Sequence, residues 1–300
     1  MEKIELKKEQ DIQDILSKYG DKSGFPFDNK TGLFLDESTP GANDGILAKS
    51  KEIWENKYDE KMKSLKNENK AKKAADSATS AVIHKPYRKF SDNIDAYKVA
   101  EALGVRICAY CNENYTYVLR LKSKKITRPE FDHFETKKRH PEKQLFLKNL
   151  VPSCHVCNSN VKGSIDFGDG KHLNPYEYSF DDIMKFSIQL QSIDWKDEKN
   201  FKIVFLPRKK RSKLNCLANG NIEDLKLEKR YQMHKDEVIK IFTNANFYYK
   251  ERREEINELL SGNRNRVLPL EQILFPDKDC SIKNTSLGKL KRDIIRLAVK

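Results

Sequence analysis

Two Cys-x-x-Cys pairs, at positions 108/111 and 154/157, constrain the fold of this 300-residue chain more than any other feature. A two-residue gap lets one turn present both thiolates to the same ion, so each pair can hold one edge of a tetrahedral zinc. The 42 residues between the pairs exceed what a compact zinc ribbon contains, so a substantial insert must be held between them. Six cysteines are too few for a disulfide scaffold, which favours a structural metal. The predicted zinc ligands are Cys108, Cys111, Cys154 and Cys157.

Sequence periodicity divides the chain into three regions. Residues 1–104 carry mainly helical spacing of apolar side chains. Residues 105–180 are β-prone, with a strand predicted over 126–134, and then contain a short helix around the second cysteine pair. Residues 181–300 begin with two strand-like segments and continue as helix, including a long amphipathic helix predicted over 224–260. That helix could serve as an interface or as a buried packing stripe.

The charge of the chain favours a polyanionic partner. The net charge is +13, and 38% hydrophobic residues are enough for a buried core, so wholesale disorder is excluded. Residues 1–104 are neutral overall, whereas residues 105–180 contain 13 basic and 8 acidic side chains and residues 181–300 contain 26 and 18. The excess positive charge therefore belongs to the insert and to the C-terminal region.

The hydropathy of the chain predicts a protein that does not contact membranes. No run approaches the roughly 18 consecutive apolar residues of a membrane helix, and the mean hydropathy is −0.78. The N-terminal segment mixes acids and bases without an apolar stretch, so no secretory signal is predicted. We expect an intracellular, cytoplasmic protein.

The insert contains the sequence Phe131-Asp132-His133-Phe134 at the end of the predicted strand. Successive side chains on a strand point to opposite faces, so the carboxylate can hold a metal while the imidazole faces a substrate. This division of roles suits hydrolysis, although an isolated Asp-His pair is more often structural.

The segments CAYCNENYTYVL, FDHF, NLVPSCHVCNSNVKG and HLNPY together resemble the HNH endonucleases, a family of ββα-metal nucleases. They are most similar to the zinc-stapled HNH proteins of bacterial anti-phage defence that are linked to retrons or paired with an ATPase in Septu-type systems. The resemblance covers about residues 104–180. It implies an α+β fold, in which a ββα-metal (HNH) core with structural zinc knuckles is embedded between mainly helical N- and C-terminal regions.

The resemblance also implies roles for individual residues. His133 would be the general base that activates water, and Asp132 would ligate a catalytic Mg²⁺ or Mn²⁺. Asn149 would hold the following loop through backbone hydrogen bonds and so orient His133. Asn158 stands where the family commonly has its last histidine, and it would be the second ligand of the catalytic cation. A neutral amide binds a cation more weakly than a charged ligand set does.

Two acid-free basic runs are predicted to contact DNA phosphates. The first lies on the segment that leads into Asp132, and the second comes after a predicted strand. Nothing resembles a base-reading helix-turn-helix, so strong sequence specificity is not predicted. The residues are Arg120, Lys122, Lys124, Lys125 and Arg128 in the first run, and Arg208, Lys209, Lys210, Arg211 and Lys213 in the second.

The sequence thus predicts a metal-dependent endonuclease that cuts DNA in bacterial anti-phage defence. Two alternatives stay open. The chain could be a nuclease subunit that is inactive until an ATPase or a retron-type sensor partner engages it, or a zinc-stapled module that binds nucleic acid without cutting it. An RNA or tRNA target and a homo-oligomeric state are also left open by the sequence.

Overall fold

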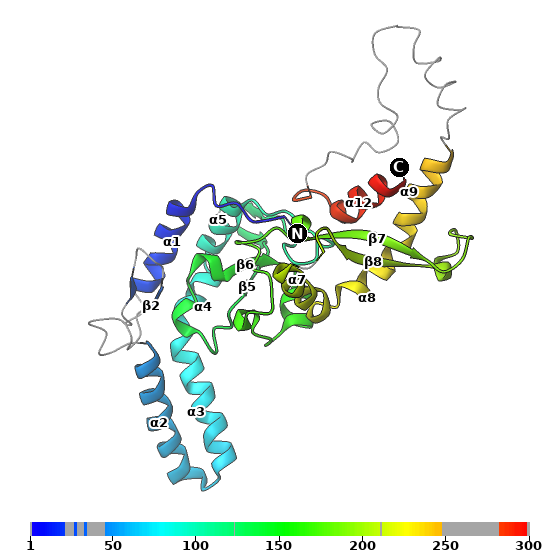
Figure 1. The fold of residues 1–300 in the computed structure, drawn as a ribbon. Coiled ribbons are helices and arrows are strands. Elements are labelled where there is room, and N and C mark those ends of the chain that lie inside the picture. The colour runs from blue at the N-terminus through cyan, green and yellow to red at the C-terminus, as the bar shows by residue number, and fades with distance from the viewer. Residues whose placement is uncertain are drawn as a thin grey trace.

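The computed structural model describes residues 2–21, 27–28, 33–34, 46–122, 124–210, 212–247 and 282–298. These residues form a mixed fold of helices and small two-stranded sheets, of the α+β type. The N-terminal elements are α1 (Glu9–Asp21), β1 (Phe27–Asp28), β2 (Leu33–Phe34), α2 (Ile46–Leu65), α3 (Glu68–Ile83), α4 (Lys85–Ser91) and α5 (Ile94–Leu103). Helices α2 and α3 lie side by side and project from the rest of the molecule (Figure 1).

Helix α5 precedes the first cysteine pair in the chain. It begins after Asn93, whose side-chain oxygen accepts a hydrogen bond from the backbone N–H of Asp95. Its buried face packs into the core through small and apolar side chains. It ends at Gly104, which adopts φ 63° and ψ 19°, a left-handed conformation that favours glycine.

The central region contains two strand pairs and an irregular helix. Its elements are β3 (Leu119–Leu121), β4 (Lys124–Thr127), β5 (Glu130–His133), β6 (Leu150–Ser153) and the π-helix η3 (Val156–Lys162). Strand β5 pairs antiparallel with β6, so that Asp132 lies opposite Val151 and His133 opposite Leu150. Two antiparallel strands followed by a helix therefore carry the Asp132-His133 pair and the second cysteine pair.

The strand predicted over 126–134 is two strands in the structure. Strand β4 pairs with β3, whereas β5 pairs with β6, and Arg128 and Pro129 separate them. Proline has no backbone N–H to donate to a sheet, which explains why pairing stops there. The prediction of one continuous strand was wrong.

The C-terminal region is built on a long β-hairpin, as predicted. Its elements are α6 (Phe180–Ile183), β7 (Met184–Leu190), β8 (Phe201–Pro207), α7 (Lys213–Asp224), α8 (Leu227–Tyr231), α9 (Lys235–Phe247) and α12 (Gly288–Ala298). Strands β7 and β8 pair over their full length, and α12 packs against β7 and α9 (Figure 1).

The long helix predicted over 224–260 is interrupted. Lys226 has φ 55°, and a 3₁₀ turn over Gln232–His234 separates α8 from α9. The side chain of Gln232 exchanges two hydrogen bonds with the backbone of Ile203 on β8, at 3.1 and 2.7 Å. Packing against the hairpin thus overrides the helical periodicity, and residues 248–260 lie outside the described part of the chain.

The C-terminal helix is tied to the first cysteine pair through Asn112. The Asn112 side chain donates to the carbonyl of Ile282 at 2.8 Å and accepts from the N–H of Lys289 at 2.9 Å. Asn112 itself is buried and has φ 56°. Segments 170 or more residues apart therefore meet at the knuckle. Among the described helices, none has the length and apolar character needed to cross a membrane.

Candidate active site and metal centre

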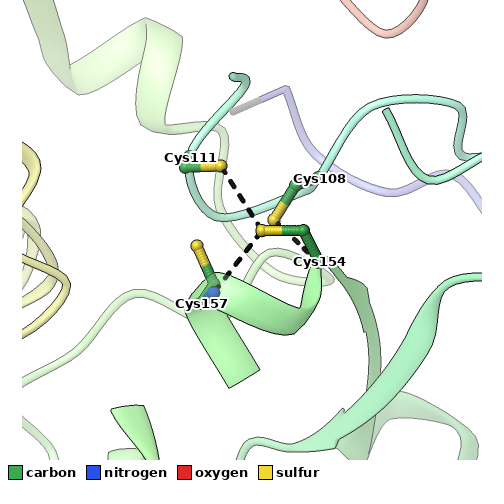
Figure 2. A group of neighbouring side chains, drawn as sticks. All are labelled: Cys108, Cys111, Cys154 and Cys157. Carbon is green, nitrogen blue, oxygen red and sulfur yellow. Dashed lines mark hydrogen bonds between the residues drawn. The ribbon is translucent and has the colours of Figure 1, made fainter. Parts of the chain in front are cut away.

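The four predicted zinc ligands converge in the structure. Their Sγ atoms all lie within 4.8 Å of one another and the side chains are buried. Figure 2 shows Cys108 and Cys111 on one loop, facing Cys154 and Cys157 at the start of the helix. A zinc bonded to four sulfurs at about 2.3 Å requires sulfur separations of about 3.8 Å. The observed distance of 3.9 Å between Cys111 Sγ and Cys154 Sγ fits such an ion.

Hydrogen-bond donors surround the four sulfurs. The backbone N–H of Cys154 donates to Cys108 Sγ at 3.3 Å, and that of Cys157 donates to Cys154 Sγ at 3.4 Å. Arg230 donates from Nη1 to Cys157 Sγ at 3.3 Å and also pairs with Glu113. Such donors stabilise thiolates and orient them toward a metal. Arg230 is 73 residues beyond Cys157, and nothing in the local sequence predicted its place there.

Within the described ranges, the cysteines form the only group of three or more Cys, His, Asp or Glu ligands near enough to share a metal. A catalytic cation would therefore be held by fewer side chains of these types. The predicted ligands of that cation, Asp132 and Asn158, lie elsewhere.

A cavity of about 820 Å³ brings together three of the four residues predicted to act in catalysis. Asp132, His133 and Asn158 line it. The same cavity is lined by further side chains that the sequence did not single out as ligands or bases, among them Tyr87, Lys137, Lys138, Arg139 and Lys162. Cationic groups thus share one cavity with the predicted base.

Asp132 is held from two sides. Its Oδ2 accepts a hydrogen bond from the hydroxyl of Tyr110 at 2.6 Å, and its Oδ1 accepts one from Nζ of Lys162 at 3.0 Å. All three side chains are buried, and Lys162 also donates to the carbonyl of His133 at 2.9 Å. Burial raises the pKa of Asp132, and the positive charge of Lys162 opposes this rise.

His133 lines the same cavity as Asp132 but has different contacts. Its Nε2 lies 3.0 Å from the carbonyl oxygen of Gln144, and its ring meets the edge of the Tyr87 ring at a centroid distance of 4.4 Å. Burial, together with the positive charge of Lys137, lowers the pKa of His133 to about 3. The imidazole is therefore neutral at physiological pH.

Asn149 does not line the cavity but holds the loop that leaves β5. Its Oδ1 accepts from the N–H of Glu135 at 2.7 Å, and its Nδ2 donates to the carbonyls of Glu135 and Lys143 at 3.0 and 3.1 Å. The side chain is buried. These are backbone contacts of the kind expected for a residue that orients His133, although that role itself stays a prediction.

Asn158 is oriented by a residue that the sequence patterns did not single out. Its Nδ2 donates to Oε2 of Glu130 at 2.8 Å, so the amide oxygen is directed away from Glu130. Glu130 also accepts from Ser159 at 3.0 Å and contacts His155 Nδ1 at 2.6 Å. Because Glu130 lies two residues before Asp132, both carboxylates belong to the same face of β5. That spacing is the signal that could have found it.

In the first basic run, three of the five side chains form hydrogen bonds or ion pairs with other residues of the protein. Arg120 pairs with Glu101 at 2.7 Å, Lys125 donates to the carbonyl of Asp92, and Arg128 donates to Ser91 at 2.8 Å. Lys122 and Lys124 are exposed at the end of the β3–β4 hairpin.

In the second basic run, one side chain forms ion pairs within the protein and others are exposed. Arg208 pairs with Asp181 at 3.1 Å and with Asp293 at 3.2 Å. Lys209, Lys210 and Lys213 are partly or fully exposed, and Arg211 lies outside the described residues. The structure therefore ties Arg208 to α12, which the sequence could not predict.

Comparison with models of known protein families, with curated proteins and with solved structures gave no match.

Proposed function

We propose that this chain is an endonuclease that hydrolyses DNA phosphodiester bonds, with His133 as the general base. The observation that carries the proposal is the cavity in which His133, Asp132 and Asn158 lie together with Lys137, Lys138 and Arg139. A phosphodiester is an anion, and these three cations would attract it to the base. The setting in bacterial anti-phage defence rests on the resemblance of the motifs alone.

The contacts of His133 define which nitrogen would act. A carbonyl oxygen can only accept a hydrogen bond, so the Nε2 atom facing Gln144 must carry the proton. In a neutral imidazole Nδ1 is then the unprotonated nitrogen. It would take the proton from the attacking water.

The pKa of about 3 is lower than the near-neutral value that suits a general base. Burial and the charge of Lys137 both disfavour the imidazolium form. A phosphate beside His133 would offset the charge of Lys137 and stabilise the imidazolium. Substrate binding would therefore raise the basicity of His133 at the moment when it is needed.

Asp132 and Asn158 would hold a catalytic Mg²⁺ or Mn²⁺ through a carboxylate and an amide oxygen, the ligand types that these ions prefer. When bound, the ion would neutralise charge on the phosphate and on the leaving oxygen. The oxygen donors of these two residues fit such an ion. Lys162 would compete with the ion for Oδ1 of Asp132. The four cysteines would hold zinc as a structural ion that fixes the helix carrying Asn158 against the strands.

The test is cleavage of supercoiled plasmid by the purified chain with Mg²⁺ or Mn²⁺. Wild type should nick or linearise the plasmid, and His133→Ala should bind DNA without cutting it. His234→Ala, which changes a histidine outside the cavity, is the matched control and should cut normally. Equal behaviour of wild type and His133→Ala with every cation would refute the assignment of His133.

A second candidate function is a zinc-stapled module that binds nucleic acid without cutting it. The observation that favours it is the hydrogen bond from Lys162, which already neutralises the single carboxylate predicted to bind a catalytic cation. DNA binding without cleavage under all tested cations supports this candidate. Cleavage that begins only when an ATPase or sensor protein is added supports the proposal that the chain is a partner-activated nuclease subunit.

A further inference from the structure

We propose that the outer face of the β3–β4 hairpin and of the segment that leads into it is a stacking surface for the unpaired bases of single-stranded DNA. We define this ribbon face by four side chains that leave the first zinc knuckle at alternate positions: Tyr115, Tyr117, Leu119 and Leu121. The choice of DNA as the ligand rests on the proposed function. The surface itself rests on the exposure, anchoring and charge of these residues.

The ribbon face is exposed along its whole length. The exposed fractions are 59% for Tyr115, 53% for Tyr117, 44% for Leu119 and 61% for Leu121. The intervening Thr116 is buried, and the other residues between them are partly buried. This alternation has the period of a strand whose one face packs on the protein while the other faces solvent. Here the solvent side carries the large apolar and aromatic groups.

The hairpin is anchored from behind, so the exposure does not come from a loose segment. Tyr115 forms an antiparallel bridge with Ile107, and the N–H of Thr116 donates to the carbonyl of Arg106 at 2.7 Å. Farther along, Arg120 forms a two-point contact with Glu101 on α5, at 2.7 and 2.9 Å. The segment from Tyr115 to Arg120 is thus attached to the protein, whereas all residues of β4 are exposed.

Charge identifies the kind of partner. No acidic residue occurs between Asn114 and Pro129. Lys124 lies opposite Leu121 in the hairpin and so belongs to the same face, and Lys122 lies at the turn. Aromatic rings beside exposed lysines and without acids match a ligand that combines flat bases with phosphates, as single-stranded nucleic acid does. A second protein strand would match the apolar groups but would leave the charge of the tip without a counterpart.

The rings are arranged for stacking on a ligand rather than on each other. The centroids of Tyr115 and Tyr117 are 6.5 Å apart with ring planes at 58°, so neither ring covers the other. In duplex DNA the faces of the bases are already stacked, which leaves an unpaired strand as the form that these rings can bind.

The experiment measures binding of the full-length chain to a fluorescein-labelled oligothymidylate of about 15 nucleotides by fluorescence anisotropy, without added divalent cation. The double variant Tyr115→Ala/Tyr117→Ala should weaken binding at least about tenfold, because it removes both rings on which bases would stack. Tyr115→Phe/Tyr117→Phe keeps the rings and should bind like wild type. Tyr178→Ala changes an exposed tyrosine outside the ribbon face and serves as the matched control.

The contribution of Lys122 and Lys124 at the tip of the hairpin is measured separately, by the salt dependence of binding. Lys122→Ala/Lys124→Ala should reduce the dependence of log K on log salt by about 1.4, since each phosphate contact to a single strand contributes about 0.7. Zinc content and circular dichroism of each variant establish that it is folded.

Several results would overturn the proposal. These are unchanged oligothymidylate binding by the folded alanine variant, tighter binding of an equal-length duplex, or tighter binding of oligouridylate than of oligothymidylate. A change of oligomeric state in the alanine variant, with DNA binding unaffected, would assign the face to a second copy of the chain instead. His133→Ala should bind the oligonucleotide like wild type, so loss of cleavage and loss of stacking are separate outcomes.

Discussion

Lys162 and Asp132 form a buried ion pair at the centre of the candidate active site, with Nζ and Oδ1 3.0 Å apart. Nζ also donates to the carbonyl of His133 and lies 5.0 Å from the centroid of the Phe167 ring. One ammonium group thus connects the π-helix to the end of β5. Because both side chains are buried, each charge depends on the other for its stability.

Replacing Lys162 should destabilise the fold strongly. Lys162→Met leaves the carboxylate of Asp132 buried without its counter-charge, which typically costs about 3 to 5 kcal/mol. The measurement is the free energy of unfolding in denaturant, with the exposed Lys171→Met as control. Asp132→Asn combined with Lys162→Met should recover part of the loss. Additive effects of the two substitutions would show that the pair is not coupled.

Removal of the zinc should unfold the central region. Cys154→Ser takes one thiolate from the cluster of four, and structural zinc sites contribute directly to folding. The variant should not retain the zinc proposed for this cluster and should be more sensitive to proteolysis than wild type. Cys216→Ser, which changes an exposed cysteine outside the cluster, should keep both. Full zinc occupancy in Cys154→Ser would contradict the four-cysteine site.

Asn149 should contribute to both stability and activity. In Asn149→Ala the backbone N–H of Glu135 loses its acceptor, and an unsatisfied buried group costs about 1–3 kcal/mol. The matched control is Asn160→Ala, on the exposed side of the π-helix. Thermal unfolding measures the first effect and plasmid cleavage the second. Loss of stability with unchanged cleavage would remove Asn149 from the positioning of His133.

The stability of the protein should fall in acid partly because of His84. Burial, together with the positive charges of Lys137 and Arg88, lowers the pKa of His84 to about 4. An unfolded histidine binds a proton near pH 6.5, whereas the folded one resists it, so acid favours unfolding. The contribution of His84 to stability should therefore be constant above about pH 6.5 and should decrease between about pH 6.5 and 4.

The comparison variant is His84→Leu, which has no imidazole to protonate. Its unfolding midpoint should decrease less between about pH 7 and pH 5 than that of wild type. Parallel pH curves for the two proteins would show that His84 does not contribute. Part of the acid effect should persist in the variant, because burial lowers the pKa of His133 as well.

Local patterns predicted those elements whose partners are close in sequence. The β7–β8 hairpin follows from two β-prone segments separated by a short charged connection. The prediction of one helix over 224–260 was wrong because the interruption depends on the contact between Gln232 and Ile203 of strand β8, which is 29 residues away in sequence. The spacing of apolar residues along the chain carries no information about such a contact.

The sequence by itself determined the four-cysteine centre, because Cys-x-x-Cys spacing brings each pair of sulfurs together within a single turn. The alternation of side chains along a strand also predicted opposite directions for Asp132 and His133, and both residues line the same cavity in the structure. Only the tertiary structure decided which groups meet them: Lys162 against Asp132, the Gln144 carbonyl against His133, and Arg230 against Cys157. These partners are selected by burial and packing between distant segments, where an unpaired polar group is costly, and no local spacing encodes that requirement.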